Sequence, residues 1–288
     1  MKVEDIKKVG LMGCGTMGST LVAALSPKFE MVAVEATEEL AGRVIKNVSA
    51  CFYPFVKKGK MTEEQRDGTL SKVKVTTDIE ELKDCQLVID AVPDDLELKG
   101  KLLAKANEIC SPDAIFSTTS SIMSITALAE KSNRPENFIG MHFCNPAHLM
   151  ALVEVAPALQ TSEETVEFAM DFCRALGKKP VKCKDRPGFI VNSLLFPFMI
   201  SAVQALESGL ATAEDIDTAC KLGLGHPMGP FELLDMVSID TSVVTFPVMY
   251  ERTKDTRFAT PLLIQQMYEA GYLGRKVGKG FYDYQKKK

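Results

Sequence analysis

Short apolar runs rich in valine and isoleucine recur through the first part of the chain. Each run is only a few residues long, which is typical of a strand that is covered on both faces rather than of a buried helix. We therefore expect strands over residues 9–12, 31–34, 73–75, 87–92, 114–116, 138–141 and 152–155.

Stretches with helical spacing of apolar residues lie between several of these runs, at residues 17–25, 40–56 and 96–109. Alternation of strands and helices predicts a mostly parallel sheet with helices on both faces. After Lys184 only helical periodicity remains, including one continuous stretch over residues 231–250. We therefore predict an α/β domain over residues 1–185 and an all-helical domain over residues 186–288.

The composition is that of an ordinary globular protein, with 46% hydrophobic and 25% charged residues. A balance of 34 basic against 38 acidic residues argues against nucleic acid or an anionic membrane as the main partner. No apolar run reaches the roughly 20 residues that span a bilayer, and we expect neither a membrane segment nor an export signal. The eight cysteines form no CxxC pair, which predicts reduced thiols, a cytoplasmic protein and no metal site.

The first predicted strand runs directly into a complete GxGxxG sequence at residues 13–18, which opens a helix. In this motif the first glycine permits a tight turn, the second lets the backbone approach a pyrophosphate, and the third lets helix and strand pack closely. Free amide groups and the helix dipole then favour an anion at the helix N-terminus. The motif predicts a Rossmann-type domain that binds a dinucleotide. The residues expected to contact it are Gly13, Gly15, Thr16, Met17 and Gly18.

The second predicted strand is followed by Glu35. An acidic side chain at this position accepts hydrogen bonds from both hydroxyls of the adenosine ribose. The same carboxylate would repel the additional phosphate of NADP, and the next seven residues contain no arginine that could neutralise it. We therefore expect NAD as the cofactor. The alternative is a glycine-rich turn that binds no ligand.

Only three histidines are present, so a general base that works near neutral pH has few candidates. His142 follows a predicted strand, and open α/β sheets bind ligands at strand ends. Glu154 lies in the apolar segment 152–156, where a carboxylate needs a partner. If these segments are neighbouring strands, Glu154 can face His142, fix its tautomer and stabilise its charged form. A structural histidine and a carboxylate that faces solvent are the alternatives.

Asn192 lies inside an apolar helical stretch, residues 189–203. A side-chain amide in such surroundings needs hydrogen bonds. Contact with a substrate and a structural bond within the core both remain open for this residue.

Five motifs occur together in the chain: GCGTMG at residues 13–18, HFCNPAHLMALVEV from His142, KDRPGFIVN ending at Asn192, HPMGPFELLD from His226 and GRKVGKGFYDY near the end. In this order and spacing they resemble the L-3-hydroxyacyl-CoA dehydrogenases over nearly the whole chain, most closely the bacterial 3-hydroxybutyryl-CoA members. The agreement of five motifs is far more specific than any one of them.

The resemblance implies roles for individual residues. His142 matches the family's catalytic base, Glu154 its carboxylate partner, and Asn192 the amide that contacts the substrate. Counting back from His142 without a gap puts the active-site serine at Ser121, whereas one inserted residue would put it at Ser120. The remaining matches are cofactor contacts at Asp94, Lys99 and Asn145, and a contact to CoA at Lys58.

Three positions depart from the family's pattern. Thr119 replaces the asparagine of the usual NTSS run, and the lysine that commonly follows Met150 is absent. Pro54 replaces another lysine and should kink or end its helix. Residues 41–75 nevertheless contain eight basic and three acidic side chains, which suits the phosphates of CoA. A solvated helix face is the alternative explanation of this basic excess.

The resemblance implies an enzyme that interconverts (S)-3-hydroxyacyl-CoA, with 3-hydroxybutyryl-CoA as the expected substrate, and the 3-oxoacyl-CoA by hydride transfer with NAD. It also implies a homodimer formed through the helical domain. The pathway, fatty-acid breakdown or butyrate formation, stays open. The alternatives are a sugar-acid dehydrogenase similar to L-gulonate 3-dehydrogenase and a non-catalytic structural protein that binds NAD.

Overall fold

The computed structural model describes residues 1–285 and divides the chain into two compact units. The first unit is Met1–Phe189, and the second begins at Ile190. The division falls a few residues after the boundary at 185 and 186 that the sequence suggested. The first unit is of the α/β type and the second contains only helices, so the predicted fold class is confirmed.

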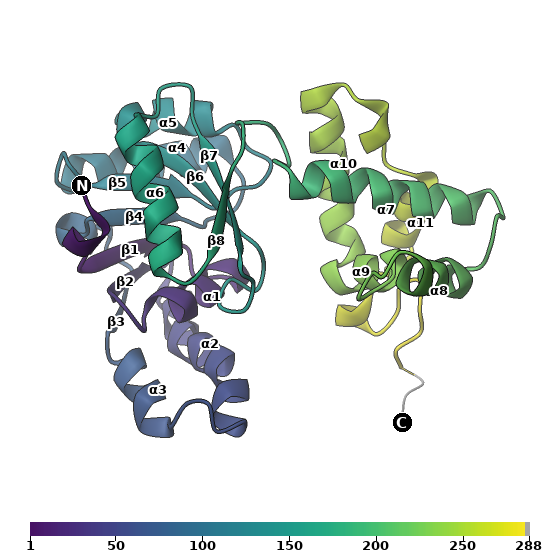
Figure 1. Cartoon of the computed structure of the whole chain (residues 1–288), viewed down its shortest axis with the longest axis horizontal. Helices are drawn as coiled ribbons and strands as arrows, with labels where there is room; N and C mark the ends of the chain where they lie inside the picture. Colours follow the sequence, from purple (N-terminus) through teal and green to yellow (C-terminus); the bar gives the residue numbers. More distant parts are fainter. Residues whose placement is uncertain (286–288) are drawn as a thin grey trace. The chain divides into compact units, whose positions relative to one another are not determined.

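The first unit is built around a sheet that has eight strands within residues 1–285 (Figure 1). The strands are β1 (Lys8–Met12), β2 (Glu30–Val34), β3 (Val73–Thr76), β4 (Leu87–Asp90), β5 (Ile115–Thr118), β6 (Phe138–Phe143), β7 (Leu152–Pro157) and β8 (Lys179–Lys182). Their order is β3-β2-β1-β4-β5-β6-β7-β8. Strands β1 to β6 are parallel, β7 runs antiparallel to β6, and β8 is parallel to β7.

All seven predicted strands are present, and β8 is the one that the pattern missed. Its sequence, Lys-Pro-Val-Lys, lies at the edge of the sheet and is mostly exposed. An exposed edge strand needs no apolar run, so hydrophobic pattern gives no signal for it.

Helices cover both faces of the sheet. They are α1 (Thr16–Leu25), α2 (Glu38–Lys57), α3 (Glu63–Leu70), α4 (Leu96–Ile109), α5 (Ile125–Lys131) and α6 (Glu163–Ala175), with 3₁₀ turns at Val3–Asp5, Ile79–Asp84 and Pro135–Asn137. The apolar residues of α1, α2 and α6 form one core cluster with the sheet, and those of α4 and α5 form a second. Neighbouring residues of one strand contribute to different clusters, as Leu11 and Met12 of β1 do, because side chains alternate between the faces of a strand.

Helix starts in this unit follow local capping chemistry. The side chains of Thr37, Asp95, Ser124 and Ser162 each accept a hydrogen bond from a backbone amide in the first turn of α2, α4, α5 and α6, respectively. Such caps satisfy amides that have no partner within the helix. At its other end, α2 continues past Pro54 for one turn and ends at Lys57.

The second unit consists of α7 (Val191–Glu207), α8 (Ala213–Gly223), α9 (Pro230–Val237), α10 (Ile239–Thr253) and α11 (Leu262–Glu269), with 3₁₀ turns at Thr256–Phe258 and Arg275–Val277. Its core is formed by side chains such as Ile200, Phe231 and Phe246. Each of these three is buried, so the unit has its own apolar core.

The prediction of one continuous helix over residues 231–250 is wrong. Helices α9 and α10 meet at Ser238, whose φ is +82°, and they are bent by 98°. A positive φ at this residue ends the helical path although the apolar spacing continues on both sides. Within residues 1–285 no single helix is long and apolar enough to cross a membrane, and only this bent pair passes such a test of length and composition.

Candidate active site

A cavity of about 880 Å³ lies within the first unit at the carboxyl ends of β1, β2, β4 and β5. This is the edge at which open α/β sheets bind ligands. Nine of the residues that line it were singled out from the sequence: Gly13, Gly15, Met17, Glu35, Asp94, Thr119, Ser120, Ser121 and His142. The dinucleotide motif and the candidate base therefore share one cavity.

The three glycines of the motif occupy the positions that its chemistry requires. Gly13 has a φ of +85°, which favours glycine, and its amide donates to the carbonyl of Val34 at 2.9 Å. A Cβ on Gly18 would lie 2.1 Å from the carbonyl oxygen of Gly13, so only glycine fits between helix and turn. A Cβ on Gly15 would meet no atom within 4 Å, which leaves open space beside the start of α1.

The N-terminus of α1 has the properties of an anion site. Gly15 is its N-cap, no side chain caps it, and the helix begins at Thr16. The first amides of α1 are therefore not used by a capping side chain, and the helix dipole favours a negative group there. These residues fit the pyrophosphate of a dinucleotide.

Glu35 lies directly after β2 and lines the cavity. Its Oε1 accepts a hydrogen bond from the amide of Cys14 at 2.6 Å, and its Oε2 accepts a longer one from the amide of Ala36 at 3.3 Å. These bonds hold the carboxylate beside the glycine-rich turn, where it can accept further bonds from a ribose. Burial and the charge of Glu35 together raise the pKa of the Cys14 thiol to about 12.

Lys99 does not line the cavity, and its side chain is only 1% exposed. Its Nζ lies 2.8 Å from Oδ2 of Asp90, 2.8 Å from the carbonyl oxygen of Val92 and 3.4 Å from Oδ1 of Asp94. Val92 and Asp94 do line the cavity. Lys99 therefore supports the cavity wall from behind.

Sequence reasoning missed Asp90, the partner of Lys99. Asp90 is completely buried; its Oδ2 also accepts from the hydroxyl of Thr118 at 2.8 Å, and its Oδ1 accepts from the amide of Val92 at 3.1 Å. Burial raises the pKa of Asp90, and the Lys99 ammonium opposes that rise. A signal was available, because a carboxylate at the end of an apolar strand needs a cation, and Lys99 is such a cation in the following helix.

One face of α4 also lines the cavity, and it was not predicted from the sequence. The cavity is lined by three residues of α4, Leu98, Leu102 and Lys105. Thr77 and Ile79, which precede β4, line it as well. The spacing of the three α4 residues places them on one helix face, which is a visible signal. The direction in which that face points depends on how α4 packs, and the spacing does not specify it.

His142 and Glu154 lie directly opposite each other on β6 and β7. The predicted pairing of their two segments as neighbouring strands is confirmed by this register. Nδ1 of His142 lies 2.7 Å from Oε2 of Glu154, which is completely buried, while the imidazole side chain is 12% exposed. With Nδ1 directed at the carboxylate, Nε2 is the ring nitrogen left for proton transfer. The ring also packs against Phe189, with centroids 5.6 Å apart.

Ser120 and Ser121 both line the same cavity as His142. Ser120 is buried, and its Oγ accepts a hydrogen bond from the amide of Met123 at 3.2 Å. The Ser121 hydroxyl has no hydrogen-bond partner within residues 1–285, although its carbonyl accepts from the amide of Gly188 at 2.7 Å. Thr119 is also buried, and its hydroxyl donates to the carbonyl of Asp90 at 3.3 Å.

Seven of the predicted site residues do not line this cavity. Thr16, Gly18, Lys99 and Glu154 adjoin or contact residues that do, and the other three are Asn145, Lys58 and Asn192. Asn145 is exposed in the turn after β6, where it precedes the cis peptide bond to Pro146. Lys58 is exposed at the C-cap of α2. Asn192 belongs to the second unit, where it lies in the first turn of α7 and is partly exposed.

Two family models match the chain and together cover nearly all of it. Residues 8–186 match the NAD binding domain of 3-hydroxyacyl-CoA dehydrogenase, and residues 188–284 match the C-terminal domain of the same family. The 3-hydroxybutyryl-CoA dehydrogenase of Mycobacterium tuberculosis is 39% identical over 98% of this chain and 99% of its own length. The mitochondrial hydroxyacyl-coenzyme A dehydrogenase of Mus musculus is 38% identical over 97% of this chain and 91% of its own length.

A solved structure agrees with these sequence matches. The (S)-3-hydroxybutyryl-CoA dehydrogenase PaaH1 from Ralstonia eutropha has a TM-score of 0.91 and 37% identity, over 97% of this chain and 99% of that one. The family models divide the chain near the same point as the two units do. On these findings the chain belongs to the 3-hydroxyacyl-CoA dehydrogenase family, and its first unit contains that family's NAD-binding domain.

Proposed function

We propose that the protein is an NAD-dependent (S)-3-hydroxybutyryl-CoA dehydrogenase with His142 as its general base and acid. The observation that carries this proposal is the His142 imidazole, held at 2.7 Å by the buried Glu154 and lining the cavity that begins at the glycine-rich turn. A base in this position serves proton transfer next to a dinucleotide. The four-carbon substrate is supported by the similar proteins from Mycobacterium tuberculosis and Ralstonia eutropha, which are 3-hydroxybutyryl-CoA dehydrogenases.

The residues of the first unit would bind NAD along the cavity. The pyrophosphate fits the glycine-rich turn and the start of α1, at Gly13, Gly15, Thr16, Met17 and Gly18. The adenosine ribose fits Glu35.

The nicotinamide end of NAD suits Asp94 at the cavity wall, and Lys99 acts on that end through Asp94 and Val92. Asn145, on the turn after β6, remains a candidate contact in its exposed position. NAD, when bound, supplies the hydride acceptor for C3 of the substrate.

The catalytic step assigns the proton to His142. Nε2 removes the proton of the 3-hydroxyl as the hydride leaves C3, and in the reverse direction it returns that proton to the developing alkoxide. Glu154 keeps Nδ1 protonated and stabilises the imidazolium. The Ser121 hydroxyl, which is free of partners within residues 1–285, donates to the substrate oxygen. Asn192 is kept as the candidate amide contact to the substrate that the family resemblance implies.

The CoA part of the substrate carries anionic phosphates that cationic side chains can bind, and Lys58 is the candidate contact. It lies exposed at the end of α2, within the basic stretch of residues 41–75. Phosphate groups pair readily with such lysines, and binding of this remote part can help to position the acyl group.

A homodimer formed through the second unit and a cytoplasmic location complete the proposal. Large apolar side chains are exposed on this unit, with Leu222 at 83%, Leu210 at 77% and Leu194 at 70%. Exposed apolar patches commonly mark interfaces, and light scattering coupled to size exclusion would report the mass. None of the eight cysteines forms a disulfide within residues 1–285, which suits the cytoplasm.

The deciding experiment is NADH oxidation with acetoacetyl-CoA, with NADPH as the alternative donor and His142→Ala beside the wild type. We expect fast turnover with NADH, little with NADPH, and a loss of about 100- to 10,000-fold in the variant while NAD binding is retained. Wild-type protein that binds NADH without turning over the acyl-CoA would contradict the proposal. L-gulonate with NAD is then the next substrate, and inactivity there would favour a non-catalytic protein.

A further inference from the structure

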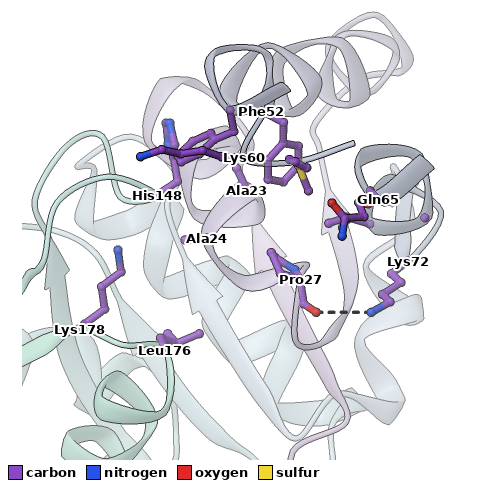
Figure 2. Close-up of a pocket in the computed structure, with 14 residues that line it drawn as sticks. Ala23, Ala24, Pro27, Phe52, Lys60, Gln65, Lys72, His148, Leu176 and Lys178 are labelled. Atoms are coloured by element: carbon purple, nitrogen blue, oxygen red, sulfur yellow. Dashed lines mark hydrogen bonds between the residues drawn. The ribbon is translucent and has the colours of Figure 1, made fainter. Parts of the chain in front are cut away.

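A second cavity, of about 590 Å³, lies in the first unit beside the C-terminal end of α1 (Figure 2). We call it the lysine cavity; its walls are Ala23, Ala24 and Pro27 at the end of α1, the last turns of α2, residues of α3, and the segments around His148 and residues 176–178. It shares no lining residue with the cofactor cavity. It is therefore a separate binding space and not an extension of the NAD site.

The charge of the lysine cavity is one-sided. Lys60, Lys72 and Lys178 line it, and no aspartate or glutamate does. Within residues 1–285 none of these lysines has a carboxylate within ion-pair distance. Lys178 donates to the carbonyls of Ala147 and Met150, and Lys72 makes only a long contact of 3.4 Å with the carbonyl of Pro27. In a protein whose net charge is −4, three unpaired cations around one cavity favour an anion.

Two polar groups of the cavity wall, Oε1 of Gln65 and the hydroxyl of Thr69, are already hydrogen-bonded within the protein. Gln65 accepts a hydrogen bond from the amide of Thr62, and the Thr69 hydroxyl donates to the carbonyl of Gln65. Burial, and then the charge of Lys178, lower the pKa of His148, so its ring adds no positive charge near neutral pH. Nδ1 of His148 is buried without a hydrogen-bond partner within residues 1–285, so it is a neutral polar contact for a ligand. The lysines are the charged groups that line the cavity, and they favour an anionic head.

The rest of the cavity surface is apolar. Phe52, Phe55, Met61 and Leu176 line it, and the Phe55 ring meets the edge of the His148 ring with centroids 6.3 Å apart. The size falls within the roughly 300–1,000 Å³ of small-molecule sites. An inorganic ion would leave most of this surface without a contact, whereas an acyl chain would cover it.

The basic residues of the stretch 41–75 therefore do not all belong to one site. Lys60 and Lys72 line the lysine cavity, but Lys58, the candidate CoA contact, does not. From this separation, the one-sided charge and the apolar lining, we infer that the lysine cavity binds a fatty acyl carboxylate of medium length. The carboxylate pairs with the lysines, and the chain lies along Phe52, Phe55 and the alanines of α1.

The test is calorimetric titration of decanoate into the protein saturated with NAD, so that the cofactor cavity is filled. We expect saturable binding of one decanoate per chain. Lys60→Glu and Lys72→Glu should each weaken it about tenfold, through loss of a charge-assisted bond and added repulsion. Ala24→Met, which fills the cavity with an apolar side chain, should weaken it as well. Lys101→Glu, an exposed lysine on α4, is the matched control and should leave the affinity unchanged.

Other outcomes overturn the inference. The proposed fatty-acid site would be contradicted if decanoate did not bind saturably, or if it bound the wild type and the three cavity variants with equal affinity. Tighter binding of ADP or inorganic phosphate than of decanoate, lost in the same variants, would reassign the cavity to phosphate groups. A raised KM for acetoacetyl-CoA in Lys72→Glu would assign it to the substrate's CoA, whereas an unchanged KM supports a separate site. Wild-type turnover of acetoacetyl-CoA tests the proposed dehydrogenase independently of all these results.

Discussion

Lys99 and Asp90 form an ion pair of 2.8 Å in which neither side chain is more than 1% exposed. The pair connects the end of β4 to the fourth residue of α4. The hydroxyl of Thr118 on β5 also donates a hydrogen bond to Asp90. Through Val92 and Asp94 it supports one wall of the cofactor cavity. A buried charge pair in this place positions the residues that face the cofactor.

Removing one member of this pair should be costly. Lys99→Met leaves the Asp90 carboxylate buried without its cation, and we expect a loss of about 3–5 kcal/mol in the free energy of unfolding, measured in urea. The double variant Asp90→Asn with Lys99→Met should recover part of that loss, because no buried charge is left. Additive losses in the double variant would show that the pair does not act as a unit.

Glu154→Gln should lower kcat for acetoacetyl-CoA reduction by about 100-fold or more, because the amide neither selects the Nδ1-protonated tautomer nor stabilises the imidazolium. The affinity for NADH should change little, since Glu154 does not line the cofactor cavity. Steady-state kinetics and calorimetry measure the two quantities separately. A parallel fall in NADH affinity would indicate a disturbed fold and not a chemical role for the pair.

Glu35→Ser should weaken NAD binding about 10- to 100-fold, through loss of charge-assisted hydrogen bonds to the ribose. The same change removes the charge that opposes an additional phosphate, so the ratio of NADP to NAD affinity should rise. Glu39→Ser, in the first turn of α2 and outside the cavity, is the control. An unchanged cofactor preference in Glu35→Ser would place the ribose elsewhere.

The second unit depends on a buried carboxylate. Asp235 accepts hydrogen bonds from the amides of Phe281 and Tyr282 at 2.9 and 3.0 Å and from the Tyr284 hydroxyl at 3.0 Å. Asp235→Ala leaves these donors without their acceptor, and we expect a loss of about 3 kcal/mol in the free energy of unfolding. The exposed Glu269→Ala should change it by less than about 0.5 kcal/mol. Hydrogen exchange should locate the loosened protection around residues 281–284.

Cysteine alkylation should follow burial and thiol pKa. Burial raises the pKa of Cys14 and of Cys173 to about 12 each, so both thiols stay protonated at pH 8. Because the thiolate is the nucleophile, iodoacetamide should modify the half-buried Cys51 and Cys144 before these two. Mass spectrometry of digests over time checks the order. Reaction of Cys14 as fast as Cys51 would mean that the glycine-rich turn opens on that timescale.

The architecture and much of the candidate site were predictable from the amino-acid sequence, because those features are encoded locally. The apolar runs predicted seven strands, and the GxGxxG sequence with Glu35 predicted the cofactor site. A carboxylate in an apolar segment needs a partner, and this requirement pointed from Glu154 to His142. Each inference used residues whose chemistry is constrained by their immediate neighbours in the chain.

Features that depend on segments far apart in the chain became visible only in the folded protein. The edge strand β8 has no apolar run, and the break at Ser238 lies inside continuous apolar spacing. The family resemblance implied a cofactor contact at Lys99, and the fold adds that its ammonium is buried behind the cavity wall on Asp90. The lysine cavity joins α1, α2, α3 and the segments around His148 and Lys178. Which face of an element meets which neighbour depends on packing of the whole chain, and periodicity within one element does not contain that information.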